Sequence, residues 1–208
     1  MTSGEKATTV VAKDRDHLKK LIEEAIREKG PNCDLNFIDV SNVEDMSQLF
    51  EYSSFTGDIS DWNVSNVGNM RMMFEGSEFN GDISRWNVSK VANMEYMFYH
   101  SEFNGDISKW NVSNVEEMST MFGGGSAFNG DISNWDVSKV KRMVGMFSES
   151  GFNGDISKWN VSNVTDMRGI FLESAFKGDI SKWDLGKIQD GRGPNYPPFK
   201  NRDQEGER

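Results

Sequence analysis

The sequence predicts an α/β repeat solenoid: a right-handed stack of strand–short helix units with a parallel sheet on one face and a capping helix at the N-terminal end. Three observations predict this fold class. A near-identical unit recurs along the chain, the spacing of apolar residues changes from strand-like to helical within each unit, and an amphipathic segment precedes the first unit. Units of this length bury their apolar residues only by stacking on their neighbours.

The repeated unit is marked by the string GDIS, which begins at Gly57, Gly81, Gly105, Gly130, Gly154 and Gly178. Successive copies are 24, 24, 25, 24 and 24 residues apart, and the extra residue lies within 123–128. The consensus is G-D-I-S-x-W-[ND]-V-S-[NK]-V-x-x-M-x-x-M-F-x-x-S-x-F-N, whose residues are called repeat positions 1 to 24 below. A degenerate copy comes first, so five full repeats and two imperfect ends fill residues 33–188.

Two kinds of spacing alternate within a repeat. Ile, Trp and Val at positions 3, 6 and 8 match the L-x-x-L-x-L spacing of leucine-rich repeats, and residues two apart lie on one face of a strand. Val, Met, Met and Phe at positions 11, 14, 17 and 18 share one face of a helix of about two turns. Phe at position 23 returns to the core, and Asn-Gly at positions 24 and 1 supplies a turn.

Both ends of such a stack need caps. Residues 14–32 are expected to form an N-terminal capping helix with Asp14 or Asp16 as its N-cap and Gly30 at its end. Five apolar residues share one face of this helix: Leu18, Leu21, Ile22, Ala25 and Ile26. We expect residues 1–13 to be a flexible N-terminus and residues 200–208 a disordered tail. Residues 189–199 are expected to be an irregular C-terminal cap that includes Tyr196 and Phe199.

Bulk composition limits the possible functions. The 208 residues include 23 Lys and Arg against 33 Asp and Glu, a formal charge of −10 that argues against nucleic-acid and anionic-membrane surfaces. The single cysteine, Cys33, leaves no intramolecular disulfide. No signal peptide or apolar span is visible, so we expect a cytoplasmic location, or the cell surface if a leader has been removed.

The repeat closely resembles those of a known bacterial family. The string GDISxWxVSxVxxMxxMF is similar to the repeats of the BspA-like leucine-rich repeat surface proteins, and DLNFIDVSNVEDMSQLF looks like the usual entry to such arrays. The resemblance covers residues 15 to 188 approximately. It implies a leucine-rich-repeat-like solenoid with a binding or adhesive role, often at cell surfaces, and brings no general catalytic residues with it.

Several constant positions have a second chemical interpretation. The tryptophans at position 6 could stack on sugars, but their spacing favours core packing. Asp at position 2 could bind calcium or accept hydrogen bonds from turn amides, and the second is favoured because calcium-binding repeats are shorter and richer in Asp and Gly. The methionines fit core filling better than soft-metal binding. His17 and His100 have no partner ligand at zinc spacing, so neither a metal, a cofactor nor a catalytic residue is predicted.

The first candidate binding surface consists of positions 5, 7 and 10 on the predicted sheet face. Positions 5 and 10 hold seven cations: Arg85, Lys90, Lys109, Lys139, Lys158, Lys182 and Lys187. Three acids, Asp61, Asp136 and Asp184, lie among them, so the face carries about +4 (seven minus three) on a chain of −10. Such a basic strip would attract an acidic partner, unless the aspartates at position 2 pair with its lysines.

The second candidate surface lies on the predicted helical side. Met72, Tyr96, Tyr99 and His100 occupy positions that are polar or small in other copies, and Val144 and Leu172 extend the group toward the C-terminus. Exposed aromatic residues clustered across neighbouring repeats are typical of protein contacts.

Together these patterns predict a non-catalytic protein–protein interaction module. Its partner would be another protein, acidic where it meets the sheet face, rather than a nucleic acid or a membrane. Two alternatives stay open: a bacterial surface adhesin, and an acidic inhibitor or regulator of a basic partner protein.

Overall fold

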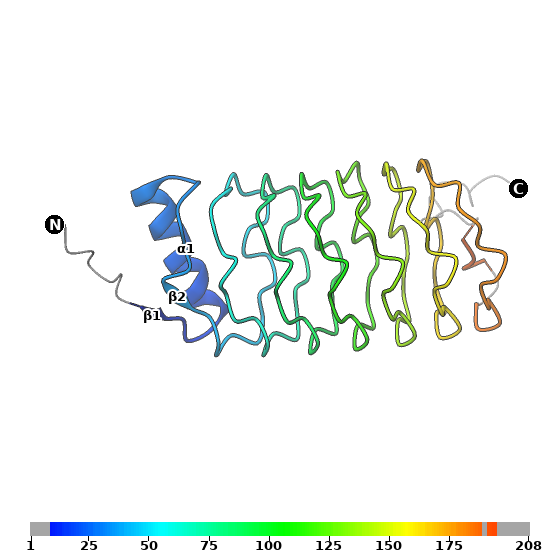
Figure 1. Cartoon of the computed structure of the whole chain (residues 1–208), viewed down its shortest axis with the longest axis horizontal. Coiled ribbons are helices and arrows are strands. Elements are labelled where there is room, and N and C mark those ends of the chain that lie inside the picture. Colours follow the sequence, from blue (N-terminus) through cyan, green and yellow to red (C-terminus); the bar gives the residue numbers. More distant parts are fainter. Residues whose placement is uncertain (1–8, 189–190, 195–208) are drawn as a thin grey trace, which may run out of the picture.

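The repeats form successive coils, one repeat per coil, stacked along the long axis of the molecule (Figure 1). The structure is a computed structural model and describes residues 9–188 and 191–194. The predicted C-terminal cap with Tyr196 and Phe199, the predicted tail and residues 1–8 of the predicted flexible N-terminus lie outside the described residues, apart from 191–194. Within the described part, Val10–Val11 are not a free end, because they form strand β1 and pair in parallel with strand β2, Ile38–Asp39.

Helix α1, Arg15–Lys29, lies across the N-terminal end of the stack (Figure 1). Asp14 is its N-cap, and the carboxylate of Asp14 accepts the His17 amide at 2.8 Å. Gly30 ends the helix at φ 89°, a value that favours glycine. The side chains that α1 buries against the first coil are Leu18, Ile22 and Ala25. Within the described residues, no helix combines the length and apolar character needed to cross a membrane.

Repeat positions 13 to 20 form a chain of turns, in place of the short helix expected there. The amide of Met70 donates to the Asn93 carbonyl of the next coil at 2.9 Å, and the amide of Phe74 donates to the Met97 carbonyl at 3.0 Å. In an α-helix these amides would bond to carbonyls four residues earlier in the same segment. Helix α1 is consequently the only α-helix in the described part of the chain.

Left-handed backbone at two positions is what excludes the helix. Positions 16 and 20 have φ between 51° and 63° in all six described copies: Gln48, Met72, Tyr96, Thr120, Gly145 and Gly169 at position 16, and Tyr52, Gly76, His100, Gly124, Glu149 and Glu173 at position 20. A right-handed helix needs negative φ at every residue. Four of these twelve residues are glycines, which adopt a positive φ without strain, and they are the only sign of this geometry in the sequence.

Repeat positions 3 to 11 also form turns, where a strand was expected. The amide of Trp62 donates to the Ile59 carbonyl three residues earlier at 3.2 Å, and the amide of Val67 donates to the Val64 carbonyl at 2.9 Å. The only sheet among the described residues is the β1–β2 pair. Isolated parallel bridges instead join position 13 of successive coils, from Asp45 to Asp166. Positions 5, 7 and 10 therefore lie along a row of turns and not on a sheet face.

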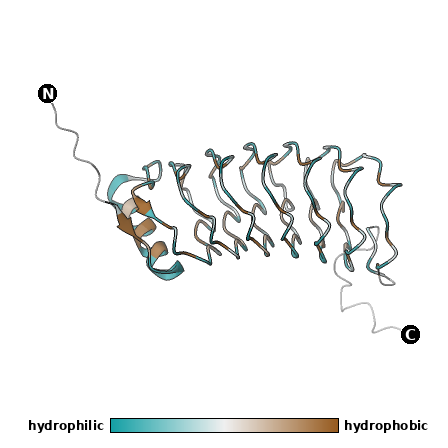
Figure 2. Ribbon diagram, turned by 60° about the horizontal axis from the view of Figure 1, so that its bottom comes forward, coloured by the Kyte–Doolittle hydropathy of each residue, from teal (hydrophilic) through white to brown (hydrophobic). Residues whose placement is uncertain are grey.

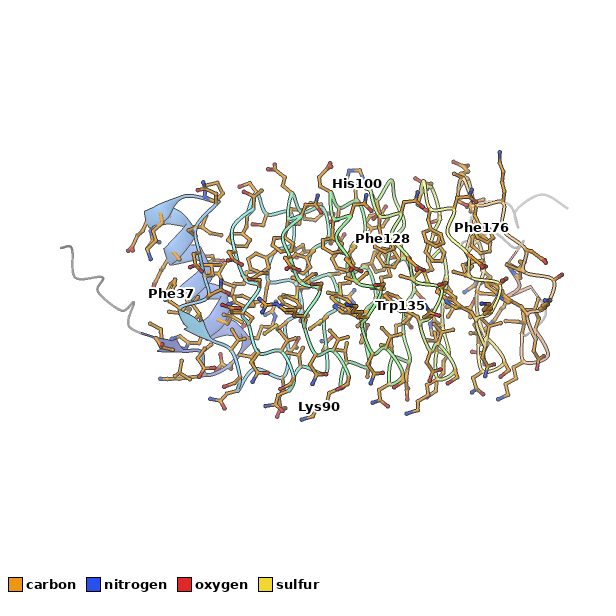
Figure 3. The ribbon with its side chains drawn as sticks, in the orientation of Figure 1. Phe37, Lys90, His100, Phe128, Trp135 and Phe176 are labelled. Atoms are coloured by element: carbon orange, nitrogen blue, oxygen red, sulfur yellow. The ribbon has the colours of Figure 1, made fainter. Side chains whose placement is uncertain are left out.

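Columns of aromatic side chains fill the centre of the stack. Neighbouring phenylalanines at position 18 have ring centroids 5.4 to 6.0 Å apart, and those at position 23 have centroids 6.0 to 6.4 Å apart. Phe128 and Trp135 lie inside the coils in Figure 3, and hydrophobic and hydrophilic segments alternate around each coil in Figure 2. The six tryptophans of position 6 are only 4 to 6% exposed, which favours core packing over a sugar-stacking surface.

Candidate binding surface

The seven predicted cations are all exposed, and two groups of them have different surroundings. The lysines at position 10 are hydrogen-bonded to asparagines of the preceding coil: the Nζ of Lys90 lies 2.7 Å from the Oδ1 of Asn66. Lys139 and Lys187 contact Asn114 and Asn163 in the same way, at 2.5 Å. The alternation of Asn and Lys at position 10 thus connects neighbouring coils.

The cations at position 5 lie near acidic side chains. Arg85 contacts Asp61 at 3.1 Å, with both side chains largely exposed. Lys109 makes no ion pair within 4.0 Å among the described residues, but it lies near Asp106. The pKa of Asp106 is lowered mainly by hydrogen bonds from Ser108 and additionally by the charge of Lys109. Lys158 and Lys182 stand in the same relation to the position-2 aspartates of their own repeats, which weakens the field of the basic strip.

The aspartates of position 2 accept hydrogen bonds from their own turns. Each carboxylate receives the backbone amide of position 4 at 2.8 to 2.9 Å, as Asp82 does from Ser84. These bonds are the leading cause of the lowered pKa of Asp82. The geometry favours the turn interpretation of this column over the calcium one. Within residues 9–188 and 191–194, no group of three or more His, Cys, Asp or Glu residues is arranged to hold a metal ion.

A pocket of about 360 Å³ opens on the chain of turns and spans repeats two to five. We call it the turn pocket. It is lined by Glu95, Tyr96, Tyr99, Ser119, Thr120, Arg142, Val144, Gly145, Ser148, Glu149, Arg168 and Leu172. All but one of these residues occupy repeat positions 13, 15, 16 and 19, and Glu149 occupies position 20. The site is therefore built from equivalent positions of neighbouring coils.

The turn pocket exists because side chains shrink along two columns. Position 16 changes from Tyr96 to Thr120 and then to Gly145 in successive repeats. Position 19 changes from Tyr99 to Gly123 and Ser148, and then enlarges again to Leu172. The inter-coil hydrogen bonds of positions 14, 16 and 18 are the same in these coils. The lost side-chain volume therefore becomes an open space between the tyrosines and Leu172.

The tyrosine wall is held in place by packing. The rings of Tyr96 and Tyr99 meet edge to face, with centroids 5.4 Å apart and planes at 74°. The Tyr99 ring covers Gly124 in the next coil so closely that a Cβ on Gly124 would lie 2.2 Å from a ring carbon. Glycine at that position is consequently required for the ring to lie where it does.

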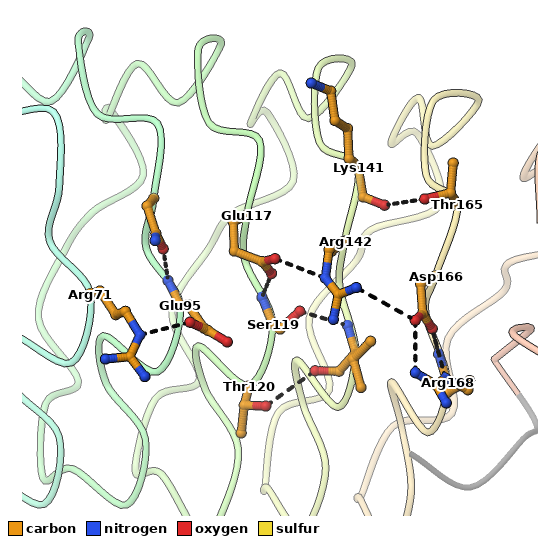
Figure 4. A network of polar contacts seen from close by, with 12 residues as sticks. Arg71, Glu95, Glu117, Ser119, Thr120, Lys141, Arg142, Thr165, Asp166 and Arg168 are labelled. Atoms are coloured by element: carbon orange, nitrogen blue, oxygen red, sulfur yellow. Dashed lines mark hydrogen bonds and ion pairs between the residues drawn. The ribbon is translucent and has the colours of Figure 1, made fainter. Parts of the chain in front are cut away.

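An ionic network runs along position 13 beside the turn pocket (Figure 4). Arg142 contacts Glu117 at 2.9 Å and Asp166 at 3.9 Å, and Arg168 binds both oxygens of Asp166 at 2.9 and 2.8 Å. Asp166 is 1% exposed. Burial alone raises the pKa of this carboxyl, but the hydrogen bonds from Arg168 and the charges of both arginines outweigh it and lower the pKa. Arg71 similarly binds Glu95 at 2.8 Å.

Glu149 differs from Glu95, the other acid that lines the turn pocket. Its side chain is exposed and makes no hydrogen bond or ion pair with any described residue. It lies close enough to Tyr99 to influence its ionisation: the pKa of the Tyr99 hydroxyl is raised first by burial and then by the charge of Glu149. A carboxylate without an ion-pair partner therefore lines the same pocket as the aromatic wall.

The structure brings together part of the second predicted surface. Tyr96 and Tyr99 share the turn pocket with Val144 and Leu172, whereas Met72 and His100 do not line it. The Nδ1 of His100 contacts the Gly124 carbonyl, and the thioether of Met72 lies 3.8 Å from the Nε2 of Gln48. The small and charged lining residues were not predicted. A comparison of side-chain size at positions 16 and 19 across the repeats would have indicated them.

A second, shallower hollow of about 380 Å³ lies near the basic strip. It is lined by Glu116, Lys139, Lys141, Asn163, Thr165 and Lys187. The Nζ of Lys141 contacts Glu116 at 2.7 Å, so each of the three lysines here already has a partner.

Comparison with known proteins identifies the family of the chain. One family model, described as "Mycoplasma protein of unknown function, DUF285", matches residues 17–124 and 100–193, which together cover most of the 208 residues. No curated protein and no solved structure matches the chain. The two overlapping matches indicate a protein built of repeats. The chain belongs to this DUF285 repeat family.

Proposed function

We propose that the chain is a non-catalytic binding module that recognises a segment of another protein in the turn pocket. The observation that carries the proposal is the loss of side-chain volume at positions 16 and 19 between Tyr96 and Leu172. The core positions of the same repeats are nearly identical, so the stack does not need this local divergence to fill its core. The lining combines aromatic and aliphatic side chains with charged and hydroxyl groups, and such convergent groups in a concave site are typical of recognition.

We further propose that the chain is a BspA-like member of the leucine-rich repeat class. The spacing of Ile83, Trp86 and Val88 and their burial support this assignment. In such scaffolds the repeated core supplies rigidity, and the outward positions determine which partner is bound.

Filling the turn pocket tests the proposal without changing the backbone. Thr120→Tyr places at position 16 the residue that Tyr96 already has there, with the same φ of 58°. The matched control is Gln48→Tyr, which makes the same substitution at the same position, φ 59°, in a coil outside the pocket. Peptides would be selected on the wild-type protein from a random library displayed on phage, and their affinities measured by fluorescence anisotropy.

Selected peptides should bind wild type and Gln48→Tyr equally, and Thr120→Tyr at least about tenfold more weakly, because a tyrosine side chain would occupy the space. Absence of any enriched peptide, or equal binding to Thr120→Tyr, would show that the turn pocket is not the recognition site.

A second candidate function is recognition of an acidic partner along the basic strip. The hollow lined by Lys139, Lys141 and Lys187 favours it, although all three lysines have partners. Charge reversal of the exposed Lys109 and Lys158 should weaken binding of an oligoglutamate peptide several-fold at low ionic strength. Unchanged binding would leave the turn pocket as the remaining candidate.

A further inference from the structure

We propose that the turn pocket takes a cationic side chain, the lysine or arginine of a partner protein, between the Tyr96–Tyr99 wall and the carboxylate of Glu149. This inference rests on the proposed function, because it specifies what the pocket binds. Three properties of the site support it: an aromatic wall, a carboxylate without an ion-pair partner, and arginines that are already paired with acids.

The aromatic wall suits the charged end of such a side chain. Tyr96 and Tyr99 are both half-buried, and their edge-to-face contact holds the two rings in fixed positions. The face of an aromatic ring attracts an ammonium or guanidinium group. Leu172, which is 39% exposed, supplies aliphatic surface for the methylene stem, and the mostly buried Val144 lines the same pocket.

The carboxylate of Glu149 supplies a charge for the cation. Glu149 and Tyr99 line the same pocket, and the charge of Glu149 contributes to the raised pKa of Tyr99. A cation placed between them would contact a negative charge and a ring at once. None of the described residues makes an ion pair with Glu149 within 4.0 Å.

The arginines of the pocket do not reverse its charge. Arg168 is bidentate on Asp166, and Arg142 contacts both Asp166 and Glu117. Glu95 is paired with Arg71. The lining itself holds two acids, Glu95 and Glu149, and two arginines, so its formal charge is zero. Its arginines and Glu95 are paired with Asp166, Glu117 and Arg71 outside the lining, which leaves Glu149 as the charged lining residue without an ion-pair partner. The chain as a whole carries −10, which also attracts basic partners.

The test uses peptides that differ at one residue. Random-sequence hexapeptide libraries with one central residue fixed as Lys, Arg, norleucine or Glu would be applied to the full-length protein, and the bound fraction measured. Norleucine has the aliphatic stem without the charge, so it separates apolar burial from cation recognition. The variant is Glu149→Gln. Its matched control is Glu173→Gln, the same exposed residue at the same repeat position in the next coil, where it does not line the pocket.

We expect the Lys and Arg libraries to bind wild type roughly fivefold to tenfold better than the norleucine library, from one exposed cation–π contact and one exposed ion pair. Glu149→Gln should remove most of this preference and leave the norleucine library unaffected, whereas Glu173→Gln should keep the preference. A preference for Glu or norleucine, or a Lys preference that persists in Glu149→Gln, would overturn the inference.

Failure of the inference can be told apart from failure of the proposed function. If libraries bind and Thr120→Tyr abolishes the binding, but Lys has no advantage, the pocket is a binding site for a different side chain. If no library binds in a manner sensitive to Thr120→Tyr, the proposed function itself fails and the inference fails with it.

Discussion

The indole Nε1–H of Trp110 donates a hydrogen bond to the carbonyl oxygen of Ile83 in the preceding coil, over 3.1 Å. The same bond connects every tryptophan at position 6 to the position-3 residue one coil earlier, with distances of 3.0 to 3.2 Å. Ile83 makes this contact through its backbone, so the tryptophan column hydrogen-bonds successive coils as well as filling the core. A buried carbonyl that loses its donor is costly.

We therefore expect Trp110→Phe to lower the free energy of unfolding by about 2 kcal/mol, through the unpaired carbonyl and the lost ring volume. Urea unfolding followed by circular dichroism measures the change. Phe103→Leu, in the neighbouring aromatic column, is the comparison that removes ring volume without removing a hydrogen bond. If Trp110→Phe is no more destabilising than Phe103→Leu, the hydrogen bond has no net role in stability.

The positive φ at position 16 allows a test of the turn conformation by substitution of a glycine. Gly145 has φ +59°, and a Cβ there would lie 3.2 Å from the Ser148 hydroxyl. Gly145→Ala should lower the free energy of unfolding by about 1 kcal/mol or more, because L-residues are strained in this conformation. Gly151→Ala is the control, since a Cβ at Gly151 meets nothing within 4 Å and its φ is not positive. Equal stability of the two variants would contradict the turn geometry.

Glu75 is a buried acid whose removal should be stabilising. It is 7% exposed, its Oε1 accepts the Tyr52 hydroxyl at 3.0 Å, and its Oε2 has no hydrogen-bond partner. Burial raises the pKa of the carboxyl. Glu75→Gln keeps an acceptor for Tyr52 and removes a desolvated charge, so it should raise the free energy of unfolding at pH 7 by about 1 kcal/mol.

The sign of the pH dependence provides the check on Glu75. A carboxyl with a raised folded-state pKa disfavours folding when it is ionised, so the gain from Glu75→Gln should shrink as the pH falls below the folded-state pKa and the wild-type group becomes neutral. Thermal unfolding of the variant and of wild type at pH 7 and pH 4 measures it. The exposed neighbour Glu78→Gln controls for the change in net charge, and the idea fails if both variants behave alike.

The aspartates of position 2 should make the fold sensitive to acid. Six of them, from Asp58 to Asp179, have a lowered pKa, caused mainly by hydrogen bonds from the serine two residues later. The folded state then binds fewer protons than the unfolded state near pH 3.8, so stability is present above that pH and is lost as the pH falls through the folded-state pKa values. The melting temperature should decline steadily below about pH 4.

Replacing one aspartate isolates this contribution. Asp106→Asn retains a side-chain oxygen for the Ser108 amide but no longer titrates. Its melting temperature should depend less on pH between pH 5 and pH 2.5 than that of wild type. An identical pH dependence would mean that the column does not determine the acid sensitivity.

The pattern of apolar residues predicted which side chains are buried. The sequence did not predict the backbone conformation of each coil equally well. The core residues of position 6, such as Trp86, and of position 18, such as Phe98, were found from spacing alone, because only a stack of repeats buries them. The i, i+3, i+6, i+7 spacing of Val91 to Phe98 also fits a helix, and it gave the wrong secondary structure. Tyr96 has a left-handed φ, but tyrosine is not a residue type that indicates this conformation in a sequence.

The turn pocket was only half predictable for a similar reason. Tyr96 and Tyr99 are aromatic where the other copies are not, so the sequence alone indicated that wall. The space beside that wall exists because Gly145 and Ser148 have small side chains. Small side chains form a pocket only where the same positions of neighbouring coils lie side by side, which the sequence does not show.

The sequence by itself determined the repeat length, the number of coils, the residues of the core and the position of the capping helix. These depend on periodicity and composition, which are properties of the chain. The tertiary structure decided the backbone of each coil and the pairing of its polar groups. The amides of positions 14 and 18 can bond within their own segment or to the next coil, as Met70 does to Asn93, and that choice depends on a neighbour 23 residues away. Local propensity cannot resolve a competition between local and inter-coil hydrogen bonds, because its outcome is set by the stacking of the whole array.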